Sequence, residues 1–172
     1  MIRLTSFLLI CLVISAGNSR AQTKKLTLED LYTKNIYYSK GTGPLRWMKD
    51  NKSYSTIEYN TAAGGSDIVR YDVVSGTHST LINASQLVPA PGRKPISISD
   101  YEWSDENSKL LLFNNTKKVW RYNTRGDYWV LNLKNGQLTQ IGKGLPESSL
   151  MFAKFSPDGS RVAYVSNLNI YA

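Results

Sequence analysis

Cysteine and histidine are nearly absent from this chain of 172 residues, which contains one of each. Cys11 lies in an apolar segment near the start of the sequence, and His78 follows a Ser-Gly pair. One cysteine cannot form a disulfide within the chain, and a zinc site needs several cysteine or histidine ligands at a workable spacing. We therefore expect packing to hold the fold, and we expect no metal and no other cofactor.

Catalytic motifs are also scarce. The nearest approach to the Gly-x-Ser-x-Gly elbow of α/β hydrolases is Gly64–Ile68, which lacks the closing glycine and lies between two predicted strands. His78 has no acid placed to orient its imidazole as in a catalytic triad. A helix start and a turn account for the acidic pairs Glu29–Asp30 and Asp105–Glu106. The sequence predicts no catalytic residue, and we expect the chain to be inactive by itself.

Charge of one sign does not gather anywhere in the sequence. Lysine and arginine number 21 against 13 aspartate and glutamate, a formal net charge of +8. The basic residues never exceed two in succession, whereas a nucleic-acid reader shows a basic stripe interleaved with stacking aromatic residues. We therefore expect no nucleic-acid partner.

The first 21 residues have the pattern of a targeting segment. Arg3 precedes the apolar stretch Phe7–Ala16, and Ser19–Ala21 offers small residues for cleavage. This pattern predicts a secretory signal peptide over residues 1–21, and so a secreted or periplasmic protein with no membrane span after cleavage. The apolar stretch is shorter than the roughly 20 residues that cross a bilayer. An uncleaved N-terminal anchor is the alternative.

A short phrase occurs three times at wide, nearly even intervals. It reads Trp47–Asn51, then Trp103–Asn107, then Phe155–Gly159, with the aromatic residues 56 and 52 positions apart. An acidic turn follows each aromatic residue, and a run of β-branched, aromatic and aliphatic residues follows each turn. Self-similarity at such a period indicates a repeat fold.

A second recurring passage supports the same period. Asp67–Gly76 matches Asp127–Gly136, with both ends offset by 60 positions. Each passage predicts a strand, a tight turn and another strand, over Thr77–Ile82 and Gln137–Ile141. A four-stranded antiparallel unit of roughly 40 to 60 residues is a propeller blade. An all-β sandwich is the alternative, but it does not explain the paired offsets.

These patterns predict an all-β fold. We expect an incomplete β-propeller of about two and a half four-stranded antiparallel blades, preceded by a short N-terminal helix. The blades are expected at about 46–88, 96–145 and 150–172, with the third incomplete.

The helix and linker are expected within residues 22–45. Thr27 with an acid three places on resembles a helix N-cap, which predicts a helix from about Leu28 to Lys34. Gly41–Pro44 is expected to be a linker, and Pro89–Pro95 a loop between the first two blades.

Three passages resemble the N-terminal propeller region of the dipeptidyl peptidase IV family, which are prolyl-oligopeptidase-type serine exopeptidases. They are Leu26–Leu31 leading to Leu45–Trp47, then Lys118–Tyr122 with Tyr128–Val130, and then Phe152–Gly159 with Val162–Val165. The resemblance runs from about residue 24 to the end of the chain.

The resemblance implies a propeller that covers a C-terminal α/β-hydrolase domain and controls which peptides reach it. Such enzymes release X-Pro or X-Ala dipeptides from free peptide N-termini, and the full-length proteins can be homodimers. Arg121 is implied to bind the substrate backbone, since a guanidinium offers several donors to a carbonyl oxygen. A solvated arginine beside Trp120 or Tyr122 is the alternative reading of that residue.

The resemblance also implies features that lie beyond these 172 residues. A glutamate pair that binds the peptide N-terminus and the catalytic serine, aspartate and histidine are expected after Ala172. We therefore expect a fragment that binds and gates substrate without hydrolysing it. The alternative function is a periplasmic binding or scaffold propeller of the Tol–Pal-associated type, which has no attached hydrolase.

Overall fold

The computed structural model describes residues 25–34, 36–37 and 41–172, and the chain divides into two units at Gly41 and Thr42. The signal peptide predicted over residues 1–21 lies outside the described residues. Among the residues that are described, no helix is long and apolar enough to cross a bilayer.

The first unit contains the short predicted helix. Helix α2 spans Leu28–Tyr32, and the Thr27 hydroxyl accepts a hydrogen bond from the Asp30 backbone N–H at 3.1 Å. The N-cap prediction is therefore confirmed. The helix ends two residues before the predicted Lys34, whose backbone N–H bonds back to the Glu29 carbonyl at 2.9 Å, a wider turn than that of an α-helix.

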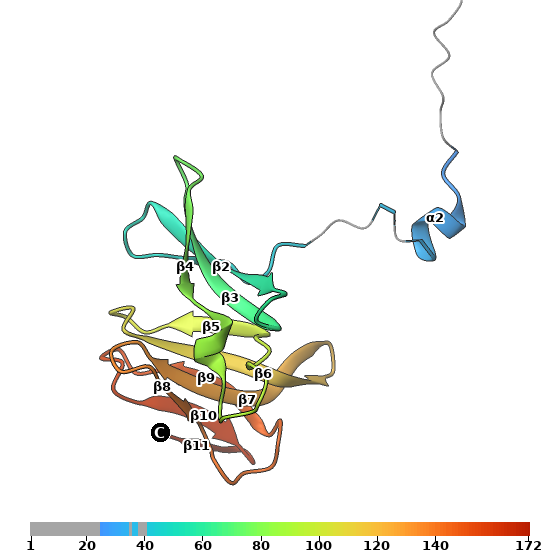
Figure 1. Ribbon diagram of the computed structural model, residues 1–172. Helices are drawn as coiled ribbons and strands as arrows, with labels where there is room; N and C mark the ends of the chain where they lie inside the picture. Colours follow the sequence, from blue (N-terminus) through green and yellow to red (C-terminus); the bar gives the residue numbers. More distant parts are fainter. Residues whose placement is uncertain (1–24, 35, 38–40) are drawn as a thin grey trace, which may run out of the picture. The chain divides into compact units, whose positions relative to one another are not determined.

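The second unit is built of antiparallel strands (Figure 1). One sheet has the order β1-β2-β3-β4, with β1 Arg46–Trp47, β2 Ser53–Asn60, β3 Gly65–Asp72 and β4 His78–Ile82. A 3₁₀ turn, η1 Ala84–Leu87, follows β4. The other strands are β5 Asp100–Trp103, β6 Lys109–Val119, β7 Tyr122–Asn132, β8 Gln137–Gln140, β9 Leu150–Phe155, β10 Val162–Ser166 and β11 Asn169–Tyr171.

We call β1–β4 blade 1, β5–β8 blade 2 and β9–β11 blade 3. Within each blade, consecutive strands pair with one another, as expected for a propeller. Blades 2 and 3 also share one ladder, because Arg125 and Gly126 of β7 pair with Met151 and Leu150 of β9. The sheets do not close into a ring within the described residues, so the fold is a partial propeller, as the repeats predicted.

The three repeated phrases form the same turn. Asn51, Asn107 and Gly159 all have left-handed φ, at 54°, 52° and 65°. In each turn, this residue donates its backbone N–H to the carbonyl three positions earlier, at 3.2, 2.8 and 2.8 Å. Asparagine and glycine are the residues that tolerate this conformation best, which explains why they recur there.

The second repeated passage also folds twice in the same way. Gly76 and Gly136 have φ of 69° and 70°, and each donates its N–H four residues back, to Asp72 at 3.0 Å and Asn132 at 2.8 Å. The side-chain oxygens of Asp72 and Asn132 accept backbone N–H bonds from the same turns. The 60-residue offset therefore reflects equivalent structure.

Hydrophobic side chains fill the space between neighbouring blades. The core between blades 1 and 2 consists of Ile68, Ile82, Leu87, Ile96, Tyr101, Leu110, Leu112 and Leu131. The core between blades 2 and 3 consists of Leu111, Tyr128, Leu150 and Ala153. Because successive residues of a strand face opposite sides, Leu111 and Leu112 of β6 enter different cores.

Candidate functional site

The β6–β7 hairpin extends beyond the rest of its sheet and carries Arg121 at its end. Each strand has 11 residues, and the ladder continues through two register shifts to Val119 paired with Tyr122. Trp120 and Arg121 form the two-residue turn, and Trp120 has φ of 61°. Glycine usually occupies the first position of such a turn when φ is positive, so a tryptophan there is unusual.

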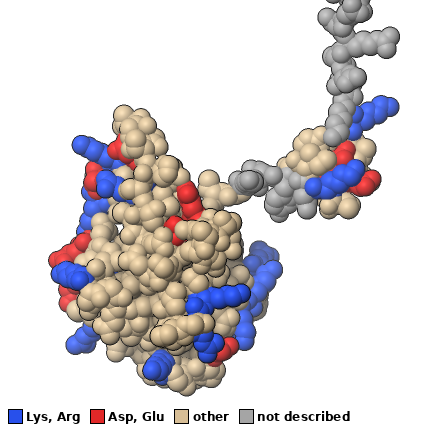
Figure 2. Space-filling view, viewed as in Figure 1, with Lys and Arg blue, Asp and Glu red and all other residues tan. Residues whose placement is uncertain are grey.

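The end of this hairpin exposes aromatic and basic side chains together. Trp120 is 94% exposed and Tyr122 is 74% exposed. Lys117, Lys118, Arg121 and Arg125 are also exposed. Figure 2 shows blue side chains gathered where Figure 1 draws the hairpin. Arg121 forms no ion pair with any residue that the structure describes, so its guanidinium can donate to a ligand.

Two adjoining pockets lie at the base of the hairpin. One has a volume of about 260 Å³ and the other about 460 Å³. Both are lined by Arg46, Asp100, Phe113 and Asn123, and the smaller one also by Phe152. We call the two together the hairpin cleft. Arg121 does not line it but stands two residues from Asn123, so a ligand in the cleft can extend toward the hairpin end.

Ion pairs between blades neutralise the charges of the hairpin cleft. Arg46 of β1 contacts the Asp100 carboxylate at 2.6 Å and donates from Nε to the Tyr101 carbonyl at 2.9 Å. Lys154 of β9 contacts the Glu102 carboxylate of β5 at 2.9 Å. The cleft therefore presents hydrogen-bonding groups and aromatic surface rather than net charge.

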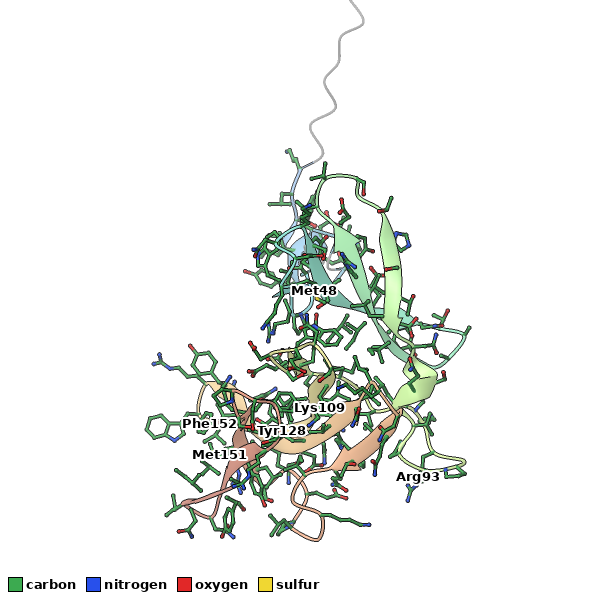
Figure 3. All side chains as sticks on the ribbon, turned by 90° about the vertical axis from the view of Figure 1, so that its left-hand side faces the viewer. Met48, Arg93, Lys109, Tyr128, Met151 and Phe152 are labelled. Carbon is green, nitrogen blue, oxygen red and sulfur yellow. The ribbon has the colours of Figure 1, made fainter. Side chains whose placement is uncertain are left out.

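A β-bulge shapes the wall of the cleft in blade 3. Phe152 and Ala153 together face Tyr164 of β10, where the register shifts, and Phe152 has left-handed φ of 55°. The bulge leaves the Phe152 side chain 59% exposed at the edge of the cleft (Figure 3). Non-glycine residues in this conformation are uncommon and often occur at functional sites.

Tyr128 and Phe113 form the aromatic floor of the cleft, with ring centroids 4.6 Å apart. Burial raises the pKa of Tyr128, although hydrogen bonds from the backbone N–H groups of Ala153 and Phe152 partly offset this. Gly126 lies beside this pair, and a Cβ atom there would collide with the Phe113 ring. The close packing of β7 on β6 therefore requires glycine at this position.

The residues that were considered as catalytic candidates and rejected lie apart from one another. Ser66 is on β3, paired with Tyr59 across the β2–β3 hairpin. His78 begins β4, with its ring 5.3 Å from that of Tyr71. In the part of the chain that the structure describes, no three histidine, cysteine, aspartate or glutamate side chains gather in a way that could hold a metal ion.

The sequence analysis missed the residues that join the blades at the cleft. Arg46, Glu102 and Lys154 each precede the aromatic residue of one repeat, so their signs alternate at one repeat position. That periodic alternation was the available signal. Asp67 and Asp127, each at the start of the second repeated passage, also have equivalent roles. Their carboxylates accept the backbone N–H of Ala84 and Ser148, both at 2.7 Å.

Comparison with known proteins agrees with this arrangement. Residues 104–172 match the family model described as the dipeptidyl peptidase IV N-terminal region. Human prolyl endopeptidase FAP is 28% identical over 170 residues, which cover 96% of this chain and 20% of that protein. Dipeptidyl aminopeptidase B of Saccharomyces cerevisiae is 26% identical over 129 residues, which cover 74% of this chain and 15% of that protein.

A solved structure is similar over most of the chain. The crystal structure of Porphyromonas gingivalis dipeptidyl peptidase 4 superposes with a TM-score of 0.69 and 26% identity, covering 86% of this chain and 20% of that one. The chain thus spans about a fifth of the length of its curated and structural relatives. The chain is therefore related to the N-terminal region of the dipeptidyl peptidase IV family.

Proposed function

We propose that this chain supplies part of the peptide-binding propeller of a secreted or periplasmic serine exopeptidase. The reaction is the release of X-Pro or X-Ala dipeptides from free peptide N-termini. The observation that supports the proposal is the hairpin end, where exposed Arg121 has the exposed residues Trp120 and Tyr122 as its neighbours in sequence, close to the hairpin cleft.

Arg121 has the role of holding the peptide backbone. Its guanidinium is permanently charged and donates hydrogen bonds to a carbonyl oxygen, while Arg46 of the cleft is already satisfied by Asp100 and two carbonyls. Trp120 and Tyr122 are its neighbours in sequence, and both offer exposed aromatic surface. The chain contributes binding and access, and these are distinct from the chemistry of hydrolysis.

Hydrolysis requires groups from elsewhere. The sequence contains one histidine and no complete nucleophile elbow. The proposed partner is a C-terminal α/β-hydrolase domain in the full-length protein, which can also be a homodimer. The coding sequence after codon 172 tests this part directly. A continuation with a glutamate pair and a Gly-x-Ser-x-Gly elbow supports the proposal, whereas a stop after a few more blades favours the scaffold propeller.

A titration tests the binding role of Arg121. A Gly-Pro-type peptide with a free N-terminus is added to the chain while tryptophan fluorescence is recorded, since Trp120 is exposed beside Arg121. We expect Arg121→Ala to weaken binding about tenfold, corresponding to about 1.4 kcal/mol. Arg93→Ala is the matched control, because Arg93 is an exposed loop arginine drawn on the opposite side of the body from Phe152 in Figure 3.

Two outcomes contradict the proposal. Equal peptide affinity of the Arg121→Ala and Arg93→Ala variants removes Arg121 from the site. Hydrolysis of a Gly-Pro reporter by the purified chain, retained in Arg121→Ala and resistant to further purification, contradicts the division between binding and chemistry.

A further inference from the structure

The β6–β7 hairpin carries Arg121 beyond the packed part of blade 2. We call residues 115–126 the hairpin extension. No side chain from 115 to 125 is buried, and neither hydrophobic core includes one of them. The ladder from Lys117 paired with Arg125 to Val119 paired with Tyr122 holds the two strands of the extension to each other rather than to the blade. The direction of the extension therefore depends on contacts at its base.

A β-bulge lies at this base. The register of β6 and β7 shifts after the pair formed by Asn114 and Asp127, so that Asn115 and Thr116 together face Gly126. Asn115 has left-handed φ of 45°. A bulge bends the strand that contains it and increases the local twist. The conformation at Asn115 therefore sets the direction in which the extension leaves the sheet.

Asp127 and Ser148 hold Asn115 in place. The Asp127 carboxylate accepts hydrogen bonds from the Asn115 side-chain amide at 2.8 Å and from the Ser148 backbone N–H at 2.7 Å. The Ser148 hydroxyl donates to the Asn115 carbonyl at 2.6 Å, which closes a ring of three hydrogen bonds. We call Asn115, Asp127 and Ser148 the clamp. Ser148 is 2% exposed and has left-handed φ of 54°, a conformation that persists only where the surrounding contacts enforce it.

Blade 1 has part of this arrangement but lacks both the third hydrogen bond and the extension. The Asp67 carboxylate accepts the Asn60 side-chain amide at 2.9 Å and the Ala84 backbone N–H at 2.7 Å. Ala84 has the place of Ser148 in this arrangement and has no hydroxyl, and the β2–β3 ladder ends at the pair formed by Asn60 and Gly65. The additional hydrogen bond thus occurs in the blade whose hairpin is extended.

Small changes at the clamp are magnified at Arg121. Six residues separate Asn115 from Arg121. A strand rises about 3.3 Å per residue, so Arg121 lies up to about 20 Å along the extension from the clamp. A rotation of about 10° at the base would displace the guanidinium by about 3 Å, whereas hydrogen-bond lengths span a range of only about 0.5 Å.

We propose that Asp127 and Ser148 are positioning residues, which set the direction of the hairpin extension and thereby the place of Arg121 in the peptide site. They act through Arg121 rather than by contact with the peptide. This inference rests on the proposed function, because the binding role of Arg121 gives the direction of the extension its consequence. It adds that peptide binding depends on a contact from the segment that leads into blade 3.

Limited proteolysis measures the clamp without any peptide. Trypsin cleaves after exposed lysine and arginine residues, which in the extension are Lys117, Lys118, Arg121 and Arg125. Mass spectrometry separates these cuts from cuts elsewhere in the chain. Ser148→Ala removes only the hydroxyl, and we expect cleavage within the extension to become about five times faster, because the extension opens more often. Asp127→Ala removes two of the three hydrogen bonds and should have a larger effect.

The peptide titration tests the positioning role. Tryptophan fluorescence is recorded with the same Gly-Pro-type peptide for the wild type and for each variant. Ser148→Ala should weaken binding about threefold and Asp127→Ala about fivefold, since the fraction of chains with Arg121 in place falls by that factor. Asp67→Ala is the matched control, because it removes the equivalent pair of hydrogen bonds in blade 1 and should bind peptide like the wild type.

The outcomes separate this inference from the proposed function. Cleavage of the extension that is as slow in Ser148→Ala and Asp127→Ala as in the wild type overturns the inference. Cleavage that is accelerated equally in Asp67→Ala also overturns it, because the effect would then be a general loss of stability. Peptide affinity that falls in Arg121→Ala but not in Ser148→Ala or Asp127→Ala overturns the positioning role and leaves the proposed function intact. Unchanged affinity in Arg121→Ala contradicts the proposed function instead, and the cleavage rates then still decide whether the clamp holds the extension.

Discussion

The contact between blades 1 and 2 buries more residues than the contact between blades 2 and 3. Eight buried residues fill the core between blades 1 and 2, including Leu87 and Ile96 from the connecting segment, whereas four fill the core between blades 2 and 3. The first contact also holds a buried polar pair, with Ser55 Oγ and Tyr101 Oη hydrogen-bonded at 2.8 Å. Cohesion between the blades should therefore be greater at the first contact, since the hydrophobic free energy scales with the buried area.

Leucine truncations on β6 should reveal this difference most strongly. Leu112→Ala empties a site in the first core and should lower the free energy of unfolding by about 3–5 kcal/mol, whereas Leu111→Ala in the second core should cost about 2–3 kcal/mol. The two residues are adjacent, and both are nearly inaccessible to solvent. Urea denaturation measures both free energies. Equal costs would mean that the two contacts are energetically equivalent, and a reversed order would mean that the second contact is the stronger.

The two segments that connect successive blades should contribute equally to stability, in contrast to the two cores. Asp67 and Asp127 each accept a hydrogen bond at 2.7 Å from a backbone N–H of the connecting segment that follows. Each also accepts a hydrogen bond from an asparagine side-chain amide, at 2.9 and 2.8 Å. Asp67→Ala and Asp127→Ala should each lower the free energy of unfolding by about 1–3 kcal/mol, because a donor is left unsatisfied. Denaturation midpoints that differ widely between the two variants would contradict the equivalence.

Lowering the pH should weaken the turn formed by the first repeated phrase, and this is the smallest of the expected effects on stability. The pKa of Asp50 is lowered from 3.8 to about 2, chiefly by the backbone N–H of Lys52 and then by the Ser53 hydroxyl, with the Arg70 guanidinium also contributing. A carboxyl with a depressed pKa stabilises the fold fully above about pH 4, and this contribution is lost as the pH falls toward about 2. Thermal melts from pH 5 to 2 should show the wild-type Tm approaching that of Asp50→Asn.

The control for this prediction is Glu106→Gln, at the equivalent position of the second repeat. It should keep the pH dependence of the wild type. If the difference in Tm between the wild type and Asp50→Asn stays constant from pH 5 to 2, the ionisation of the Asp50 carboxylate is not coupled to folding.

Local patterns predicted much of the fold because each repeat turn is a short-range structure. Asn51, Asn107 and Gly159 mark left-handed positions that few residue types favour, so the turns could be located from sequence. The strand that follows Asn107 continues to Val119, beyond the apolar run that predicted it. Exposed polar residues such as Lys117 occupy this extension. Its sequence therefore lacks the alternation of apolar and polar residues that predicts a strand.

The partners in the contacts between blades were not predictable from one sequence. Arg46 pairs with Asp100 across 54 positions, and the choice of Asp100 over Glu102 depends on how the two sheets meet. The bulge at Phe152 gives no turn signal, because phenylalanine is not a residue that favours positive φ. The line of aromatic rings from Trp47 through Tyr54 and Tyr71 to His78 became visible only when strand register aligned its four members.

The extra residue in β9 has a consequence for how this protein tolerates changes in length. Side chains alternate along a strand, but Phe152 and Ala153 together face Tyr164, so the ladder absorbs the extra residue and the pairs on both sides of the bulge keep their faces. Deleting Ala153 would close the bulge into a regular ladder, with Phe155 still paired with Val162 and Met151 still paired with Val165. A one-residue deletion at the bulge should therefore preserve the strand and alter the wall of the hairpin cleft at Phe152 instead.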